Sequence, residues 1–261
     1  MKRQFVKYHG AGNDFVMVDE TQGLWLDTSQ IAPACDRRMG IGADGFMTLR
    51  SIDGQSDIAY EVRYYNADGQ IGSLCGNGSR CAVAWARELG LYEGDQVTFL
   101  ASDGPHEATY LGSGIVTVDM SDASAIADQF NGSFVDTGSP HHVIITDDVD
   151  AIDVATLGPH IRHTHYGVDG SNVNWVSRDA EGQWHIRTYE RGVENETLSC
   201  GTGAVASALV LSNKCGASSP LTFRARGGDL TIAWAIEDSG TFHRIQLTGP
   251  TEKVFEGIWP W

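Results

Sequence analysis

The chain has 261 residues, 41% hydrophobic and 20% charged, which is ordinary for a globular protein long enough to bury a core in one large or two small domains. Its net charge is −16, from 18 basic and 34 acidic residues, and Lys and Arg do not cluster, which argues against nucleic acid as a partner. No apolar run approaches bilayer length, and no long apolar stretch follows the basic start, so we expect neither a membrane-spanning helix nor a signal peptide.

In chain order, the first half reads as short strands around one helix. Phe15–Asp19 is strand-like, and Val62–Tyr65 precedes the segment Cys75–Gly78. A helix is predicted from Ser79 to Leu89. Two further strands are expected at Gln96–Ala101 and Ile115–Met120.

The second half follows the same plan. Strands are predicted at Val143–Asp147 and Gln183–Tyr189, and again at Leu230–Ile236 and His243–Thr248. Between these pairs, Ala204–Leu211 is apolar nearly all round, which predicts a buried central helix.

Landmarks of the first half recur in the second half in the same order. Three pairs, separated by 126, 125 and 124 positions, are Gly12 with Gly138, Cys75 with Cys200, and Gly104 with Gly228. A nearly constant separation favours a duplicated domain over chance resemblance between strands and turns. We therefore predict an α/β fold of the α+β type with two pseudo-symmetric domains, each a mostly antiparallel sheet or barrel wrapped around a central helix. The expected domains are residues 1–120 and 121–249, with 250–261 folding back onto the first.

The five cysteines are not expected to form a disulfide scaffold, since their number is odd and the chain is large. Free thiols in the reducing cytoplasm fit better. Cys35, Cys81 and Cys215 are interpreted as inert, buried packing residues. The histidines at 160, 163 and 165 are expected in a solvated loop.

Neither a metal nor an organic cofactor is expected. The CxxC spacing of zinc sites is absent, and no Walker motif or pyridoxal-lysine context is present. The segment Gly40–Gly45 fits the pattern GxGxxG, but no strand precedes it, so it is expected to form a loop and not a dinucleotide site.

Cys75 and Cys200 each stand in a CGxG turn just before a predicted helix. Free backbone N–H groups and the helix dipole favour negative charge there, so each thiol is expected to be a good base and the turn a good carboxylate site. Two such cysteines, related by the repeat, are suited to face each other across a cleft. One thiolate would remove a proton from a carbon held between them, and the opposite thiol would return one, which inverts the centre.

Several motifs together resemble the diaminopimelate epimerase family over nearly the whole chain. They are His9–Phe15 (HGAGNDF), Tyr65–Gly69 (YNADG), Cys75–Cys81 (CGNGSRC) and Glu190–Gly192 (ERG) leading to Cys200–Gly203 (CGTG). The resemblance implies a pyridoxal-independent isomerase of the cytoplasm that interconverts LL- and meso-2,6-diaminopimelate in lysine and peptidoglycan synthesis. It also implies a homodimer acting on a small-molecule substrate, with no membrane partner.

Carried onto this sequence, the resemblance makes Cys75 and Cys200 the acid–base pair, with His141 and Glu190 supporting the catalytic centre. The substrate-binding positions that it implies are Asn13, Asn66, Gly76, Asn77, Asn172, Glu190, Arg191, Gly201 and Thr202. An arginine fork and asparagine amides suit the carboxylate and ammonium of an amino acid. Taken singly, the three asparagines at 13, 66 and 172 also fit turn chemistry, and Glu190 with Arg191 a surface ion pair.

Two positions depart from the family pattern. Ser139 stands where an asparagine is common, and Gly45 where some members carry glutamine. These differences bear on recognition of the distal end of the substrate.

Three alternative functions remain open. One is a cysteine-pair racemase for a single-centred amino acid such as histidine or proline, which Ser139 favours. Another is an isomerase of the phenazine-biosynthesis type, which would not be expected to keep both cysteines. The last is a non-catalytic binding protein, whose mark would be the loss of Cys75 or Cys200.

Overall fold

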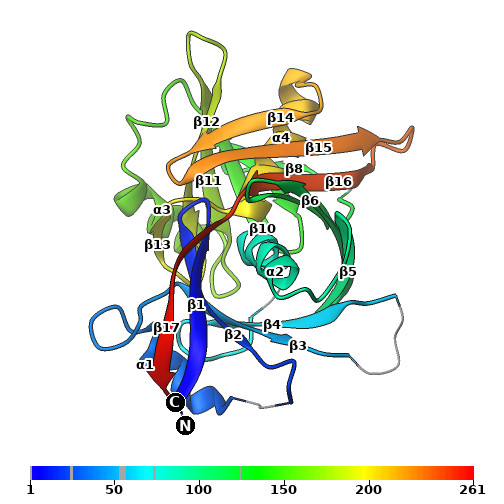
Figure 1. Cartoon of the computed structure of the whole chain (residues 1–261). Helices are drawn as coiled ribbons and strands as arrows, with labels where there is room; N and C mark the ends of the chain where they lie inside the picture. Colours follow the sequence, from blue (N-terminus) through cyan, green and yellow to red (C-terminus); the bar gives the residue numbers. More distant parts are fainter. Residues whose placement is uncertain (1, 24–25, 53–56, 73–74, 124) are drawn as a thin grey trace. The chain divides into compact units, whose positions relative to one another are not determined.

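A computed structural model describes residues 2–23, 26–52, 57–72, 75–123 and 125–261. The chain forms two compact units, which are described separately below (Figure 1). Unit 1 contains residues 1–118 and 249–261, and unit 2 contains residues 119–248.

Unit 1 is a curved, mostly antiparallel sheet. Its strands are β1 (Lys2–Gly10), β2 (Asn13–Asp19), β3 (Gly45–Arg50), β4 (Tyr60–Asn66), β5 (Gln96–Ala101), β6 (Gly104–Gly112), β7 (Ile115–Met120) and β17 (Glu252–Pro260). Neighbours pair in the order β17–β1–β2–β3–β4–β5–β6–β7. The β2–β3 and β4–β5 pairs are parallel and the others antiparallel. The last strand of the chain thus lies beside the first.

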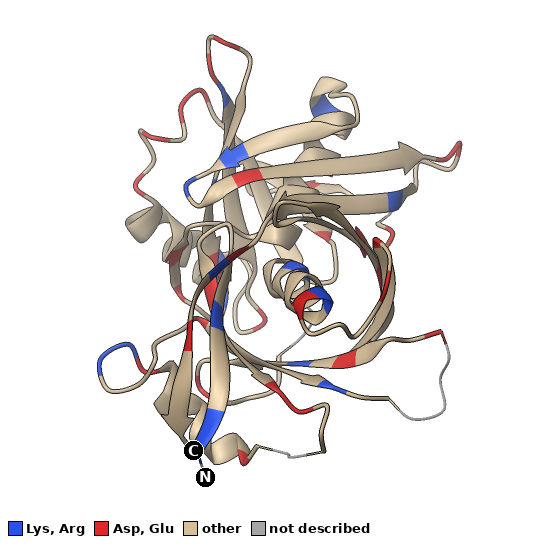
Figure 2. Cartoon of the chain, viewed as in Figure 1, with Lys and Arg blue, Asp and Glu red and all other residues tan. Residues whose placement is uncertain are grey.

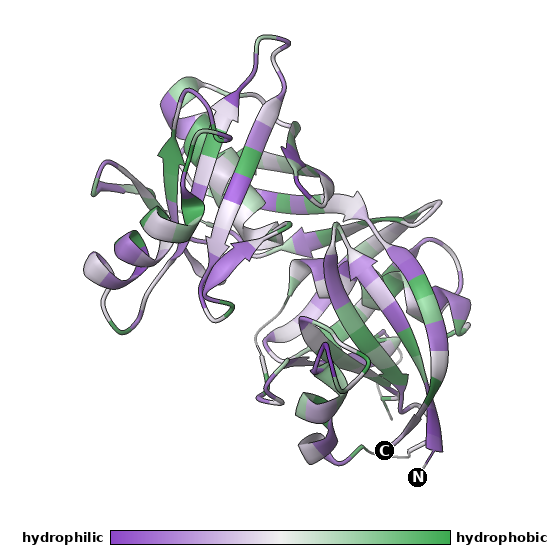
Figure 3. Ribbon diagram, turned by 90° about the vertical axis from the view of Figure 1, so that its left-hand side faces the viewer, coloured by the Kyte–Doolittle hydropathy of each residue, from purple (hydrophilic) through white to green (hydrophobic). Residues whose placement is uncertain are grey.

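Helix α2 (Gly76–Glu88) is the centre of unit 1, and the sheet curves around it (Figure 1). Strands β1 to β7 direct alternate side chains at it, among them Phe15 and Met17 of β2 and Met47 and Leu49 of β3. Figure 3 shows by colour where hydrophobic and hydrophilic residues lie along the strands. Each fully buried apolar side chain of this size stabilises the fold by about 1.5–3 kcal/mol. This shared core holds the first turn of α2 in place.

The other face of the β1–β4 part of the sheet has its own small core. The short helix α1 (Ile31–Cys35), which follows the 3-10 turn η1 (Thr28–Gln30), covers it. Cys35 is buried there, and Cys81 is buried in the core around α2, which confirms a packing position for both. Residues 36–44 form a loop before β3, as predicted for the glycines at 40 and 42.

Unit 2 repeats this architecture. Its strands are β8 (Ala127–Gln129), β9 (Gly132–Asp136), β10 (Pro140–Ile145), β11 (Asn172–Arg178), β12 (Trp184–Glu190), β13 (Asn195–Thr197), β14 (Leu221–Ala225), β15 (Gly228–Ile236) and β16 (Phe242–Pro250). They pair in the order β8–β9–β10–β11–β12–β14–β15–β16, with β13 also beside β12. Only β10–β11 and β12–β14 are parallel.

The sequence of pairings from β1 to β7 is therefore the sequence from β9 to β16. The central helix comes after the fourth strand of this order in both units, and in unit 2 the short β13 lies between them. This identity of topology confirms the predicted fold class and the duplication behind it. Helix α4 (Gly201–Cys215) is the counterpart of α2. Its residues Gly203–Leu211 are all buried, as predicted from Ala204–Leu211, which is apolar nearly all round.

Helix α3 (Val154–Thr164) packs on the outer face of the unit 2 sheet, where Val173, Trp175 and Tyr189 form its core. Gly158 permits the close approach, because a Cβ there would lie 2.4 Å from the Tyr189 ring. His160 and His163 belong to this helix, so their predicted loop was wrong: an aspartate cap at Asp153 and the apolar face toward the sheet outweigh the local polarity.

One cysteine prediction was also wrong. Cys215 is exposed, because it is the last residue of α4, which ends at Gly216 in a left-handed conformation (φ 65°) beyond the core. Lys and Arg, in blue, and Asp and Glu, in red, are scattered over the strands, helices and loops of both units (Figure 2). Within the described part of the chain, no helix is both long enough and apolar enough to cross a membrane.

Candidate functional site

Cys75 and Cys200 occupy the same place in the two units, as the residue that caps the N-terminus of the central helix. Both are extended, with φ/ψ of −107°/109° and −128°/116°, and the next three residues form the first helical turn. The N–H groups of a first turn have no carbonyl acceptor within their own helix. In each unit these N–H groups and the positive end of the dipole lie beside the sulfur, so each turn is suited to hold an anion.

In unit 1, a tight hairpin brings Asn13 to Cys75. Ala11 and Gly12 form its two-residue turn, both with positive φ (51° and 84°), as type I′ turns require. Gly10 lets the hairpin touch α2, because a Cβ there would lie 2.7 Å from the Asn77 carbonyl oxygen. The Cys75 thiol then donates to Asn13 Oδ1 at 3.6 Å.

The orientation of the Asn13 amide is fixed on both sides. Its Nδ2 donates to Asp44 Oδ2 at 2.9 Å, and its Oδ1 accepts from Asn77 Nδ2 at 3.3 Å. Asn77 is oriented in turn by Arg80, whose Nη2 donates to Asn77 Oδ1 at 2.9 Å. The Asp44 carboxylate can only accept, so it must face the amide nitrogen of Asn13. The Arg80 guanidinium can only donate, so it faces Asn77 Oδ1 and leaves Asn77 Nδ2 to donate to Asn13. The amide oxygen of Asn13 is therefore the atom that faces the sulfur.

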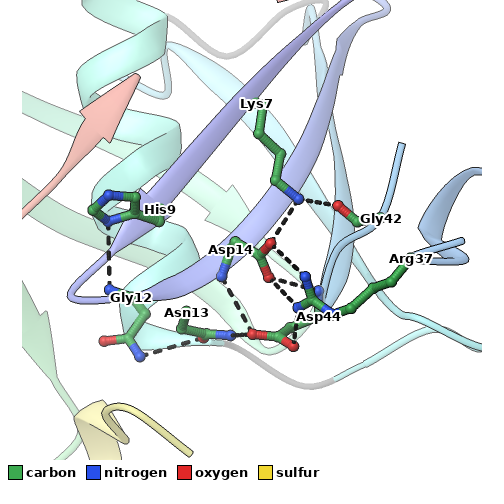
Figure 4. A network of polar contacts seen from close by, with 9 residues as sticks. Lys7, His9, Gly12, Asn13, Asp14, Arg37, Gly42 and Asp44 are labelled. Atoms are coloured by element: carbon green, nitrogen blue, oxygen red, sulfur yellow. Dashed lines mark hydrogen bonds and ion pairs between the residues drawn. The ribbon is translucent and has the colours of Figure 1, made fainter. Parts of the chain in front are cut away.

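A charged network anchors Asp44 (Figure 4). Arg37 binds Asp44 at 2.7 Å and Asp14 at 2.7 and 3.0 Å, and Lys7 Nζ lies 2.7 Å from Asp14. Burial acts to raise the pKa of Asp14, but hydrogen bonds from Arg37 and Lys7 outweigh it and hold that pKa well below its usual range. Asp14 therefore stays ionised at neutral pH and binds both cations.

Arg80 is completely buried in the first turns of α2. It donates to Gly76 O (3.3 Å) and to the amide of Asn77. Burial lowers the pKa of its guanidinium to about 10, which leaves it a cation at neutral pH.

A small pocket opens beside Cys75 within unit 1. Its lining is Met47, Val62, Tyr64, Cys75, Ser79, Ala101 and Ser102. Gly45, one of the two departures from the family pattern, faces this pocket's Tyr64: a Cβ at Gly45 would lie 2.6 Å from the tyrosine ring. The ring thus takes the space that a glutamine at position 45 would need.

In unit 2, His141 and Thr202 connect to Cys200. His141 Nε2 lies 2.9 Å from Thr202 Oγ1, and that oxygen lies 3.5 Å from Cys200 Sγ. Burial lowers the pKa of His141 to about 3, and the charge of Arg191 adds to the effect. The imidazole is therefore neutral at neutral pH and has one N–H to donate.

Asn174, which the sequence analysis missed, determines which nitrogen carries that proton. Its Nδ2 lies 3.2 Å from the His142 carbonyl oxygen and 3.1 Å from His141 Nδ1, and its Oδ1 accepts from Thr188 at 2.9 Å. A carbonyl oxygen only accepts, so Nδ2 is the donor and His141 Nδ1 the acceptor. The imidazole proton therefore lies on Nε2, directed at Thr202.

Asn172, Ser139 and Arg191 form a second polar group in unit 2. Asn172 Nδ2 donates to Ser139 Oγ and to Pro140 O, both at 3.0 Å, and its Oδ1 accepts from the Arg191 backbone at 2.8 Å. Asn172 thus braces the turn before β10 against the turn after β12. Ser139, the second departure from the family pattern, takes part in this bracing.

Glu190 and Asn66 lie at the ends of corresponding strands. Glu190 ends β12 and accepts from Thr197 Oγ1 at 2.9 Å, while the exposed Arg191 guanidinium donates to Asp169 O at 2.9 Å. Asn66 ends β4, pairs across the sheet with Gly45, and forms the following turn through its backbone. Its side chain is exposed.

Asn174, Asp44 and Arg80 are the contributors that sequence reasoning did not find. Asn174 had a signal, because Asn172 and Asn174 put two amides on one face of an otherwise apolar strand. Asp44 and Arg80 acquire their roles only through contacts distant in sequence. Among the described residues, no group of His, Cys, Asp and Glu side chains is arranged to hold a metal ion.

Comparison with known proteins adds family evidence to this geometry. A family model described as diaminopimelate epimerase matches residues 5–126 and 133–254. Proteins named diaminopimelate epimerase from Flavobacterium psychrophilum and Chlorobaculum tepidum are 43% and 40% identical to the chain. The first alignment covers 96% of this chain and 97% of the relative, and the second 95% and 98%.

Solved structures share the fold at lower identity. A phenazine biosynthesis protein of Bacillus anthracis aligns over all of both chains with a TM-score of 0.80 and 14% identity. A hydroxyproline epimerase of Agrobacterium vitis, with bound trans-4-hydroxy-L-proline, aligns over 99% of this chain and 91% of its own with a TM-score of 0.69 and 13% identity. This fold therefore occurs with more than one activity, so the sequence relatives carry the functional argument.

Proposed function

This chain belongs to the diaminopimelate epimerase family, as its motifs indicated, and on that premise we propose that it interconverts LL- and meso-2,6-diaminopimelate without a cofactor. One observation carries the proposal: two cysteines cap equivalent helices in a duplicated fold, each beside first-turn N–H groups. A single such cysteine would suit a nucleophile. A pair related by duplication suits two-base inversion.

In the proposed reaction, the α-carbon of the substrate lies between Cys75 and Cys200. One thiolate takes the α-proton and becomes a thiol, and the electron pair of the broken C–H bond moves toward the substrate carboxylate. The other thiol then delivers its proton to the opposite face and becomes a thiolate. The N–H groups at Gly76–Asn77 and Gly201–Thr202 stabilise the charge that develops on the carboxylate.

The remaining residues divide between binding and positioning. We assign Asn13, Asn77 and Thr202 to positions next to the reacting centre, since they contact the cysteines or their helix turns. His141 supports the centre as a neutral hydrogen-bond donor. Asn66, Asn172, Glu190 and Arg191 are assigned to the substrate by the family resemblance, and the hydrogen bonds of Asn172 favour an indirect part for it, in shaping the loops.

The cellular setting is part of the same proposal. We place the enzyme in the cytoplasm, in lysine and peptidoglycan synthesis, as a homodimer with two epimerase domains at residues 1–120 with 250–261 and at 121–249. Exposed apolar side chains on β17, Val254, Phe255 and Ile258, support an interface between copies. The two compact units support the domain division.

The second candidate is a racemase acting on a single-centred amino acid. The shared fold with the hydroxyproline epimerase and the serine at position 139 favour it. It differs from the first candidate only in the substrate's far end.

A substrate panel separates the two. Purified protein, without pyridoxal phosphate or metal, would be offered LL-diaminopimelate, L-histidine, L-proline and L-lysine, and the products would be resolved by chiral chromatography. Inversion of diaminopimelate alone supports the proposal. Inversion of another amino acid instead would move the activity to the second candidate, and inversion of none would refute both.

A further inference from the structure

We propose that Arg80 is the buried cation that balances the charge of the substrate carboxylate at the N-terminus of α2, and that it acts through the first helical turn as a positioning residue for the reaction. The identity of that ligand as diaminopimelate rests on the proposed function. The positive charge of the site follows from the residues of unit 1 alone, so it can be tested without turnover.

Arg80 is a fully buried cation without an acidic partner. Its exposed fraction is 0%, and burial lowers its pKa only to about 10, so it keeps its charge at neutral pH. Its hydrogen bonds go to two neutral oxygens, Gly76 O and Asn77 Oδ1, and within the described part of the chain its Nε–H has no acceptor and no Asp or Glu forms an ion pair with it. A buried charge without a counter-ion costs a fold much, which points to a use for Arg80 other than stability.

The architecture does not require an arginine at this position. Arg80 is the fifth residue after Cys75, and the fifth residue after Cys200, in the equivalent helix α4, is Val205. Val205 is also fully buried, with an exposed fraction of 0%. Because an apolar side chain fits the same position in the duplicated unit, packing alone does not explain the charge of Arg80.

The charged network around Asp44 does not supply the missing counter-ion. Arg37 binds both Asp44 and Asp14. Lys7 adds a second cation, 2.7 Å from Asp14. The network thus holds two carboxylates and two cations, which balance one another, and the positive charge of Arg80 is left over.

The neighbouring thiols do not balance Arg80 throughout the reaction either. Burial raises the pKa of Cys81 well above its usual range, so that thiol is neutral at neutral pH. In the proposed reaction Cys75 is a thiolate at only one stage. A carboxylate is negative throughout, and it gains charge as the electrons of the broken C–H bond move onto it.

Arg80 is placed to act on such a ligand through the first turn of α2. Its Nη1 donates to Gly76 O at 3.3 Å, and the N–H of the same peptide group belongs to Asn77. A cation at the carbonyl end polarises the peptide group and makes its N–H a stronger donor. Nη2 holds the Asn77 side chain, which in turn orients Asn13. The guanidinium thereby adds a full charge to the partial charge of the helix dipole.

This charge favours the transition state over the bound substrate. A fixed cation stabilises a ligand more as its negative charge grows, and the carboxylate is most negative when the α-proton has left. Preorganised charge of this kind lowers the barrier without having to reorganise during the reaction.

Alkylation of Cys75 with a matched pair of reagents tests the charge of the site. Iodoacetate carries a carboxylate and iodoacetamide is neutral, and both react with the thiolate. The ratio of their rates at one cysteine does not depend on how much of it is thiolate, so the ratio reports the attraction of an anion to the site. Peptide mass spectrometry would quantify Cys75 and, as the reference, exposed Cys215. We expect the ratio at Cys75 to exceed that at Cys215 by about tenfold.

Substitution of Arg80 should remove this preference and leave the protein folded. Arg80→Met should lower the ratio at Cys75 to about that at Cys215, while Arg80→Lys keeps the charge and most of the ratio. The urea midpoint of Arg80→Met should be unchanged or higher, because no carboxylate loses its partner. A merely structural role predicts the reverse, a lower midpoint and an unchanged ratio. With LL-diaminopimelate, Arg80→Met should lower kcat/KM about 100-fold.

The proposal is overturned if the wild-type ratio at Cys75 is no higher than that at Cys215, or if Arg80→Met leaves the ratio or kcat/KM unchanged. Arg80→Gln, which keeps a donor for Asn77 but lacks the charge, gives the same test if Arg80→Met does not fold. Wild-type protein that is inactive on diaminopimelate would refute the proposed function, whereas the alkylation ratios would still decide whether Arg80 makes this turn an anion site.

Discussion

Gly78 and Gly203 are the third residues after the two cysteines, at equivalent positions in the first turns of α2 and α4. A methyl group at these positions would meet different neighbours. At Gly203 the new Cβ would lie 2.4 Å from Asn174 Oδ1 and 3.3 Å from both Cβ and Sγ of Cys200. At Gly78 it would meet Met47, 2.6 Å from Cε at the free end of that flexible side chain.

The two substitutions should therefore have different effects on the free energy of unfolding. Replacing glycine by alanine within a helix raises the free energy of unfolding by up to about 1 kcal/mol. For Gly78→Ala a rotation of Met47 removes the clash, so we expect a change within about 0.5 kcal/mol of zero or a small gain. For Gly203→Ala the buried Asn174 must move, and overpacking of about 1–3 kcal/mol exceeds the helical gain. A net loss of about 1–2 kcal/mol is expected.

Gly203→Ala should also lower activity more than Gly78→Ala. Displacing Asn174 removes the hydrogen bond that holds the His141 tautomer, so the Thr202 hydroxyl loses its fixed direction. We expect kcat to fall about tenfold, because the lost hydrogen bond is worth about 1–2 kcal/mol.

Urea unfolding of both variants, followed by circular dichroism, measures the first effect, and steady-state epimerase kinetics the second. Equal stability and equal activity of Gly203→Ala and Gly78→Ala would refute the reasoning, because it would mean that Asn174 moves without cost.

Three further predictions follow from other parts of the molecule. Because burial lowers the pKa of His141 to about 3, the unfolded chain binds more protons below about pH 6.5, and stability should fall as the pH drops from that value toward 3. At about pH 5, His141 should lower the free energy of unfolding by about 2 kcal/mol. His141→Gln should make the free energy of urea unfolding depend less on pH. An unchanged pH dependence would count against a neutral buried imidazole. Mild peroxide should join Cys75 to Cys200 and stop the enzyme; non-reducing peptide maps with only sulfenic acids or other pairings would contradict their convergence. Arg187 binds both carboxylate oxygens of Glu196 at 2.7 and 2.8 Å, so Arg187→Met should cost about 3 kcal/mol in urea unfolding, and a loss under about 0.5 kcal/mol would mean that the pair is too well solvated to matter.

Local sequence was enough to find the central helices and the repeat. A CGxG turn before an apolar run marks a helix start, and Ala204–Leu211, which is apolar nearly all round, must be buried in the core. The predicted strand at Val143–Asp147 begins three residues too late and ends two residues too late, since β10 spans Pro140–Ile145. Pro140 by itself favours a turn. Because it pairs with Asp136 of β9, the strand begins there in spite of that local preference.

The polar contacts around the cysteines could not be predicted in the same way. Asp44 reaches Asn13 across 31 positions, and His141 reaches Thr202 across 61, so neither pair has a local signal. The direction of each hydrogen bond depends on a whole chain of partners that ends in a group of fixed polarity. Sequence reasoning therefore identified Asn13, His141 and Thr202 as site residues through the family resemblance, but it did not find Asn174, Asp44 or Arg80.

Inversion by the proposed mechanism needs both thiols, because one cysteine removes the α-proton and the other delivers a proton to the opposite face. Wild-type protein, Cys75→Ala and Cys200→Ala would each be incubated with LL-diaminopimelate in heavy water, and deuterium at the α-carbon and configuration would be measured by NMR and chiral chromatography. The account predicts that wild type inverts the centre with solvent deuterium in the product, and that neither variant inverts it. Inversion by either variant would contradict the two-cysteine mechanism.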